Sequence, residues 1–208
     1  MTRFMKLTSY TGGFCATNGY LIETPEGNLV IDAPEGIAAW VAAHGVRVDD
    51  VLLTHQHFVH VMDAAALQAA GARLHALEDY SEEFTLESVT RRWGMPVTVA
   101  PYRIDQRLMP GQSRPFELCG LAFSLYHIPG HALDSVVFHL PDSGLAFSGD
   151  TLFAGSIGRT DLPGGNPQQL LDGIARHLLT LPPQTRLLPG HGPATTIGEE
   201  LADNPYLT

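Results

Sequence analysis

Short runs of hydrophobic residues alternate with glycine, proline and charged residues along the whole chain, and their spacing predicts a mixed α/β protein. Alternating or continuous apolar runs predict strands, whereas runs with helical spacing that end at a glycine predict helices. The expected strands cover residues 4–8, 17–23, 28–32, 51–53, 73–77, 120–127, 135–140, 144–148 and 185–188. The expected helices cover 35–44, 60–70 and 168–180, and helix-prone acidic sequence covers 78–93.

Strands and helices alternate in both halves of the chain, with no linker-like or low-complexity break between them. We therefore expect a single domain, residues 1–208, in which mixed sheets are covered by helices. The turn at 24–27 (TPEG) predicts a hairpin between two strands, and Gly45 is well placed to end a helix. The proline-rich stretch 94–118 gives no clear prediction.

The composition argues against several kinds of partner. The 208 residues carry a formal net charge of −10, and no basic cluster is longer than Arg91-Arg92. Nucleic acids and anionic membranes need a basic footprint, and no run approaches the ~18 apolar residues of a membrane span. The first residues show no secretory signal. Cys15 and Cys119 are expected to be two buried, reduced thiols, so we predict a cytoplasmic protein; its oligomeric state is left open.

Histidines are clustered in the segment 54–60 (THQHFVH), where an apolar strand ends and a helix begins. His55 and His57 are two positions apart, so an extended backbone points both imidazoles to the same side. Neutral imidazole is a good ligand for zinc or iron, and a metal site needs about three or four such ligands in close geometry. Because a pair of this kind also occurs by chance on polar strand edges, the segment alone does not establish a site.

Three other strands end in the same way, at a turn of small residues that precedes an imidazole or a carboxylate. His131 follows Pro-Gly, Asp150 follows Gly149, and His191 stands between two glycines. Glycine lets the backbone turn tightly at each of these points. Four strand ends that each present a ligand type predict a metal site.

The ordered motifs HxHxxH, PGH, SGDTLF and PGHGPATTIGEE resemble those of the metallo-β-lactamase superfamily. The segments 149–153 (GDTLF), 155–165 (GSIGRTDLPGG) and 190–207 are most similar to its glyoxalase II-like hydrolases, especially their short bacterial members. The resemblance spans residues 17 to 207. It implies an α/β (α+β) protein with the four-layer αββα sandwich of the metallo-β-lactamase fold and with metals at one edge of its two sheets.

The resemblance also implies which side chains hold metal. The implied ligands are His55, His57 and His131 for a first ion, His60 and His191 for a second ion, and Asp150 as a bridge between the two. Asp150 and His191 are accordingly the expected catalytic residues.

One expected ligand is missing, because Val59 stands where the family has an aspartate. Valine has no lone pair, so we expect one firmly bound Zn²⁺ or Fe²⁺ and a second site that is weakened. Asp63 lies one helical turn beyond Val59, and its carboxylate would point along the same face. It would either compensate as a ligand or only favour the first turn of the helix through the macrodipole, and the second role is the favoured one.

The expected chemistry is hydrolysis. A dication held by imidazoles and a carboxylate lowers the pKa of bound water from ~15.7 toward ~7, so a metal-bound hydroxide is the expected nucleophile. No GxSxG motif for a serine nucleophile is present. A thiolate leaving group needs little protonation, and the resemblance points to a glutathione thioester such as S-lactoylglutathione. The chain ends soon after His191, where larger glyoxalase II enzymes carry glutathione-binding helices, so the thiol part would be held differently or loosely.

Two other functions stay open. A mononuclear iron dioxygenase acting on glutathione persulfide needs only two histidines and one carboxylate, which His57, His131 and Asp150 would supply. That branch usually has a Gly-Cys-Gly-Arg run where this chain has 155–159 (GSIGR), which argues mildly against it. A degenerate member that binds metal without catalysis is the other alternative, and Val59 is its main support.

The remaining polar residues carry smaller expectations. Arg159 and Asp161 lie in the glycine-rich loop after Asp150, where they would either line the pocket or form an ion pair that holds the loop. Surface or packing roles are expected for the histidines outside the motifs: His44, His75, His127, His139 and His177.

Overall fold

The computed structural model describes residues 5–95, 97–111 and 115–207. Residue 4, with which the first expected strand begins, lies outside the described residues. The chain forms two compact units. The N-terminal unit comprises Met1–Leu108 with Leu118–Gly120, and the C-terminal unit comprises Met109–Glu117 with Leu121–Thr208. The single domain that the sequence leads us to expect, residues 1–208, stays a prediction.

The N-terminal unit is built on a six-stranded sheet in the order β1-β2-β3-β4-β5-β6. Strands β1 to β3 pair antiparallel, and β3 to β6 pair parallel. The strands are β1 Lys6–Gly12, β2 Thr17–Thr24, β3 Gly27–Ile31, β4 Asp50–Leu52, β5 Arg73–Ala76 and β6 Gln106–Arg107. The helices are α1 Ile37–Ala43, α2 Phe58–Val61, α3 Ala64–Ala69 and α4 Glu87–Arg92.

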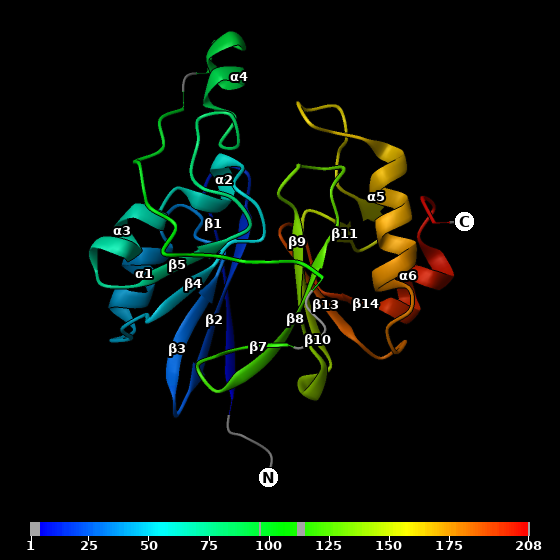
Figure 1. Ribbon diagram of the computed structural model, residues 1–208, viewed down its shortest axis with the longest axis horizontal. Coiled ribbons are helices and arrows are strands. Elements are labelled where there is room, and N and C mark those ends of the chain that lie inside the picture. The colour runs from blue at the N-terminus through cyan, green and yellow to red at the C-terminus, as the bar shows by residue number, and fades with distance from the viewer. Residues whose placement is uncertain (1–4, 96, 112–114, 208) are drawn as a thin grey trace. The chain divides into compact units, whose positions relative to one another are not determined.

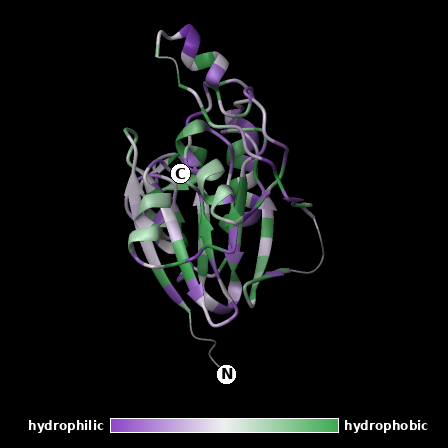
Figure 2. Ribbon diagram, turned by 90° about the vertical axis from the view of Figure 1, so that its left-hand side faces the viewer, coloured by the Kyte–Doolittle hydropathy of each residue, from purple (hydrophilic) through white to green (hydrophobic). Residues whose placement is uncertain are grey.

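The core of this unit lies between the sheet and helices α1 and α3, which cover one of its faces (Figure 1). Val30, Val51 and Leu74 of the central strands form one buried cluster with Ile37 of α1 and Leu67 of α3. Figure 2 shows hydrophobic residues along the strands and hydrophilic ones on α4. Because burial of apolar surface is the dominant favourable term in folding, this cluster stabilises β4, the strand that the candidate ligands of this unit follow.

The helix expected at 60–70 is divided into α2 and α3. The His60 carbonyl accepts a hydrogen bond from the Ala33 N–H at 2.7 Å, and the Asp63 N–H donates to the Ala33 carbonyl at 3.0 Å. These bonds to the chain after β3 replace helical bonds at the junction. The helix-prone sequence at 78–93 likewise forms only the short α4. By contrast, the predicted hairpin is present, with Thr24 paired to Gly27, and Gly45 follows α1 with φ 68°.

The C-terminal unit contains a second six-stranded sheet, in the order β14-β13-β10-β9-β8-β7, except for Leu118 at the end of β7, and the small hairpin β11-β12. Its strands are β7 Phe116–Leu118, β8 Leu121–His127, β9 Val136–Leu140, β10 Leu145–Gly149, β11 Leu152–Phe153, β12 Ser156–Ile157, β13 Arg186–Pro189 and β14 Thr195–Thr196. Its helices are the 3-10 turn η1 Pro141–Ser143, α5 Pro167–Gly173, the π-helix η2 Ile174–Leu178 and α6 Ile197–Asp203.

Helices α5 and α6 lie beside this second sheet (Figure 1). Val137, Ala146 and Leu187 of the strands form a buried cluster with Leu170 of α5 and Ile197 of α6. The helix expected at 168–180 is present as α5 followed by η2. Its start is fixed by the residue before α5, because the Asn166 side chain accepts the Gln169 N–H at 3.0 Å.

Two further observations bear on the expectations from composition. None of the helices in the described part of the chain is long and apolar enough to cross a membrane. Neither cysteine forms a disulfide, but Cys15 is exposed and Cys119 is half-buried. The prediction of two buried thiols was therefore wrong for Cys15, because this residue lies in the turn between β1 and β2, outside the core.

Candidate metal centre

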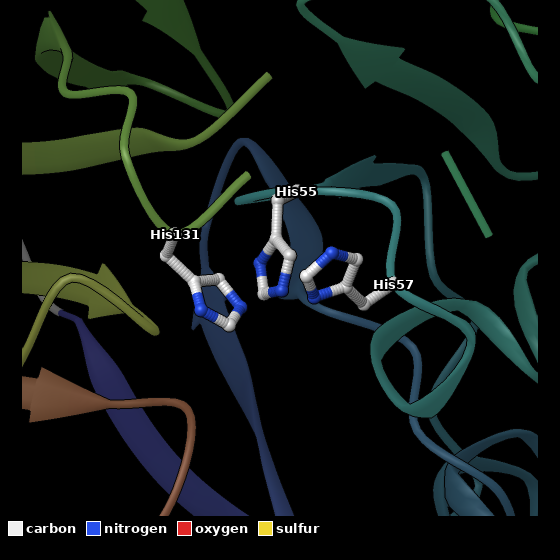
Figure 3. Close-up of side chains that lie close together, drawn as sticks. All are labelled: His55, His57 and His131. Carbon is white, nitrogen blue, oxygen red and sulfur yellow. The ribbon is translucent and has the colours of Figure 1, made fainter. Parts of the chain in front are cut away.

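The N-terminal unit brings three histidines together where β4 ends. His55 and His57 follow the strand, and His60 lies in α2, whose N-cap residue is His57. The ring centroids of His55 lie 4.6 Å from those of His57 and 4.1 Å from those of His60. In each pair, a ring nitrogen of His55 lies within 4.8 Å of a ring nitrogen of the partner. Figure 3 shows the rings of His55 and His57 next to each other.

A buried carboxylate at the end of β3 holds two of these rings. Asp32 is only 2% exposed, and it accepts hydrogen bonds from the Thr54 N–H at 2.8 Å and from the Thr54 hydroxyl at 2.8 Å. Its Oδ2 also lies 3.0 Å from Nδ1 of His60. The Thr54 oxygen in turn lies 3.2 Å from Nδ1 of His55. Asp32 therefore contacts one histidine directly and a second one through Thr54.

This network assigns the imidazole tautomers. A carboxylate only accepts, so Nδ1 of His60 carries the hydrogen. The Thr54 hydroxyl hydrogen points at Asp32, so the Thr54 oxygen is left to accept the Nδ1 hydrogen of His55. In both neutral rings the lone pair is then on Nε2. Metal-binding histidines in general donate their other ring N–H to a carboxylate, a carbonyl or water in this way.

The C-terminal unit brings together the other three predicted ligands. Asp150 directly follows β10, and its Oδ2 lies 3.6 Å from Nε2 of His131 and 3.4 Å from Nε2 of His191. His131, also labelled in Figure 3, lies on the loop after β8. Its Nδ1 lies 2.8 Å from the Arg159 carbonyl, which can only accept. The lone pair of the neutral His131 ring is thus also on Nε2, the nitrogen beside Asp150.

The donors in each unit fit a divalent transition metal. The N-terminal unit offers three imidazoles, and the C-terminal unit offers two imidazoles and a carboxylate. Zinc and iron prefer this combination of nitrogen and carboxylate ligands. The Nδ1 contacts of His55, His60 and His131 strengthen this fit. In all three rings Nδ1 positions the ring, and Nε2 carries the lone pair that can coordinate a metal.

The structure gives Val59 and Asp63 different surroundings from those of the ligands. Val59 is half-buried in α2 and lines an apolar cavity. The Asp63 carboxylate accepts the backbone N–H groups of Gly36 at 3.0 Å and Ala38 at 2.9 Å. Asp63 thus stabilises the start of α1 as well as preceding its own helix α3. These hydrogen bonds explain the position of its carboxylate without a bound metal.

The glycine-rich loop after Asp150 contributes through its backbone. Arg159 and Asp161 form a two-point ion pair with both N–O distances at 2.7 Å, as one of the two sequence interpretations holds. The hydrogen bond from the Arg159 guanidinium holds the pKa of Asp161 at about 2. Both side chains are largely exposed. It is the Arg159 carbonyl, not the ion pair, that contacts a candidate ligand.

Sequence reasoning missed Asp32 and Thr54. Asp32 directly follows an apolar strand, as Asp150 does, so the search for polar residues at strand ends could have found it. Its backbone has φ 58°, a left-handed conformation that is uncommon outside glycine, asparagine and aspartate. A non-glycine residue in this conformation often marks a functional constraint.

Known proteins resemble this chain over most of its length. The model of the metallo-beta-lactamase superfamily matches residues 12–191. The probable metallo-hydrolase YqgX of Bacillus subtilis is 35% identical over 217 residues, covering 98% of each chain. The hydroxyacylglutathione hydrolase GloC of Haemophilus influenzae is 34% identical over 198 residues, covering 91% of this chain and 92% of that protein.

Solved structures agree with these relatives. The BLEG-1 B3 metallo-beta-lactamase superposes with a TM-score of 0.85 at 32% identity, covering 98% of this chain and all of the other. TTHA1623 in a di-iron-bound form superposes with a TM-score of 0.80 at 38% identity, covering 96% and 100%. These similarities confirm the predicted fold class with its two sheets. The chain belongs to the metallo-beta-lactamase superfamily and is by family a metallo-hydrolase.

Proposed function

We propose that the histidines and the aspartate of the two units together hold one firmly bound Zn²⁺ or Fe²⁺, and that the chain hydrolyses a thioester such as S-lactoylglutathione. The observation that carries this proposal is the shared arrangement of His55, His60 and His131. Each ring is held at Nδ1 by an oxygen atom, and this would direct Nε2 toward a bound metal.

The proposed roles follow from chemistry and position. A bound divalent ion lowers the pKa of a water molecule and polarises a carbonyl group. His55, His57 and His131 would hold this ion, with Asp150 as its carboxylate ligand. Asp150 also lies close to His191. These two residues would therefore be the ones that act on the reacting group of the substrate. His60 and His191 would offer a second position, which lacks a carboxylate of its own because Val59 replaces it.

The thioester is supported by two lines of reasoning. A thiolate is a good leaving group that needs little protonation, which suits a site of imidazoles and one carboxylate. The Haemophilus influenzae relative is named for the hydrolysis of hydroxyacylglutathione. A small glutathione thioester is therefore the proposed partner. The cytoplasmic location expected from the sequence stays a prediction.

The experiment is a hydrolysis assay on protein stripped with a chelator and reloaded with Zn²⁺ or Fe²⁺. We expect reloading to restore hydrolysis of S-lactoylglutathione and a chelator to abolish it. Absence of thioester hydrolysis with either metal would contradict the proposal. Oxygen consumption with glutathione persulfide by the iron-loaded protein would then identify a dioxygenase instead.

Val59→Asp separates the proposal from the degenerate alternative. The added carboxylate would strengthen the second position. If one ion is enough, metal content rises and the rate of thioester hydrolysis hardly changes. A large gain in rate over an almost inactive parent would show that valine had disabled the site. Asp142→Asn, an exposed change on the turn η1, is the control for handling and metal loading.

A further inference from the structure

A cavity of about 280 Å³ lies within the N-terminal unit beside the candidate ligands. It is lined by Phe14, Glu35, Phe58, Val59 and Met62 together with other residues of the same unit. We call it the Val59 pocket. Val59 stands in the chain between His57, the N-cap residue of α2, and His60. The pocket is therefore lined by the same short segment of chain that carries His57 and His60.

The walls of the pocket are mainly apolar. Phe58, Val59 and Met62 come from α2 and its end. Phe14 is 75% exposed and stacks on Phe58, with ring centroids 6.0 Å apart and the planes inclined by 11°. A large exposed aromatic residue at the rim of an apolar cavity is typical of a ligand contact.

Charge restricts what the pocket can take. Glu35 is the one acidic or basic residue among the described residues that line the pocket. A carboxylate at the wall repels anionic groups, and apolar walls offer no compensation for a buried charge. The glutathione part of a thioester has two carboxylates and an ammonium group, so it does not suit this pocket. An uncharged apolar group does.

The volume sets the size of that group. A cavity of ~150 Å³ binds benzene, which has six carbon atoms, whereas pockets for whole drug-sized ligands begin at about 300 Å³. The observed 280 Å³ thus holds one part of a substrate and is larger than a lactoyl group requires.

We propose that the Val59 pocket receives an uncharged aliphatic acyl group of roughly six to eight carbon atoms, which makes the preferred substrate a medium-chain acyl thioester. This inference rests on the proposed thioester hydrolysis, because the reacting carbonyl is placed at the ligands that flank Val59. It gives Val59 a role as a wall of the acyl site, in the position where the family has a metal-binding aspartate.

The kinetic test uses thioesters of N-acetylcysteamine with acetyl, butanoyl, hexanoyl and octanoyl groups. We expect kcat/KM to rise by about fourfold for each added methylene up to hexanoyl. Thr98 also lines the pocket and is exposed, so Thr98→Trp should fill it and abolish the dependence on chain length. The matched control is Thr180→Trp, at an exposed position in the C-terminal unit, which should keep the dependence.

A second variant tests the rim without filling the pocket. Phe14→Ser should lower kcat/KM for the hexanoyl substrate by about tenfold and leave the acetyl substrate within about twofold. Leu201→Ser, at another exposed hydrophobic residue on α6, is the control and should change neither. Equal kcat/KM for all chain lengths in the parent protein would overturn the proposal.

A binding test that needs no hydrolysis separates this inference from the proposed function. Cys15 lines the pocket and is exposed, whereas burial raises the pKa of Cys119 to about 12. Alkylation at pH 8 should therefore modify Cys15 first. We expect hexanamide to slow this labelling and acetamide to have no effect. Protection without any thioester hydrolysis would refute the proposed function alone. Hydrolysis without protection by hexanamide would refute the acyl pocket alone.

Discussion

The two units hold their candidate ligands by different means. In the N-terminal unit, side chains do the positioning, because Asp32 and Thr54 bind Nδ1 of His60 and His55. In the C-terminal unit the backbone does it, because the Arg159 carbonyl binds Nδ1 of His131. Glycines with positive φ stand before the ligands there, including Gly130 at 128° and Gly149 at 49°.

This difference predicts different responses to mutation. A side-chain network can be altered one atom at a time with little effect on the fold, and the result should appear in metal affinity. Replacing a glycine in such a turn causes steric strain, so the effect should appear as a lower free energy of unfolding.

Gly130→Ala should break the backbone arrangement of the C-terminal unit. A Cβ atom there would lie 2.5 Å from the Asn166 carbonyl oxygen and from the Leu170 nitrogen, at φ 128°. We expect the free energy of unfolding to fall by about 3 kcal/mol or more, measured by denaturant titration. Gly144→Ala is the control, because its φ is 61° and no heavy atom lies within 4 Å; it should cost about 1–2 kcal/mol. Equal costs would contradict the account.

Asp32→Asn should loosen the side-chain network of the N-terminal unit and leave the fold intact, because asparagine tolerates the left-handed backbone. Both carboxylate oxygens of Asp32 accept hydrogen bonds, one of them at Nδ1 of His60, whereas asparagine has a single accepting oxygen and so loses one of these contacts. We expect metal affinity, measured by chelator competition, to fall about 10- to 100-fold. Unchanged affinity would show that the contact between Asp32 and His60 does not position a ligand.

Acidification should affect the two units in different pH ranges. Burial lowers the pKa of His139 in the C-terminal unit, so the folded state binds fewer protons than the unfolded state. Stability is then lost as pH falls through about 6.5, the pKa in the unfolded chain, by at most ~1.4 kcal/mol per pH unit. His139→Phe should flatten this slope between pH 7.5 and 5.5 in denaturant titrations. An unchanged slope would exclude His139 as its source.

The corresponding group in the N-terminal unit titrates at lower pH. Burial alone would raise the pKa of Asp50, but hydrogen bonds from His75 and Arg73 outweigh it and hold the pKa below its usual value. Its contribution is therefore present above about pH 3.9 and is lost as pH falls further. Asp50→Asn should remove this acidic loss in denaturant titrations, and an unchanged loss would exclude Asp50 as its source.

Arg159→Ala should have the smallest effect. The ion pair with Asp161 is exposed, and exposed pairs contribute little. Because the backbone carbonyl of this residue contacts His131, the variant keeps the contact. Metal affinity should stay within about twofold of the parent. A tenfold loss would mean that the side chain, not the backbone, orients His131.

Much of the fold was predictable from local patterns. Strand β8 at 121–127 and strand β9 at 136–140 differ by one residue from the ranges predicted from their apolar runs. Helix α6 was missed although it carries a helix-start signature. The Thr196 hydroxyl accepts the Glu199 N–H at 3.2 Å and donates to its carboxylate at 3.0 Å, which is the Thr-x-x-Glu capping pattern.

Other features depend on contacts between distant segments. The break between α2 and α3 arises from hydrogen bonds to Ala33, about thirty residues earlier in the sequence, which periodicity cannot reveal. The candidate ligands at strand ends could be predicted from the sequence because glycine and proline mark the turns that precede them. Asp32 also follows a strand, so the same search could have found it, but its contacts with Thr54 and His60 could not be foreseen. Its role appears only when β3 and β4 are paired.

The proposed function requires that ligands from both units share one metal ion. The most direct measurement is the metal content of the purified protein, by elemental analysis after dialysis, for the parent and for His57→Ala and His131→Ala. We expect one firmly held ion of zinc or iron per chain in the parent and its loss in both variants. A full equivalent of metal retained in either variant would contradict it.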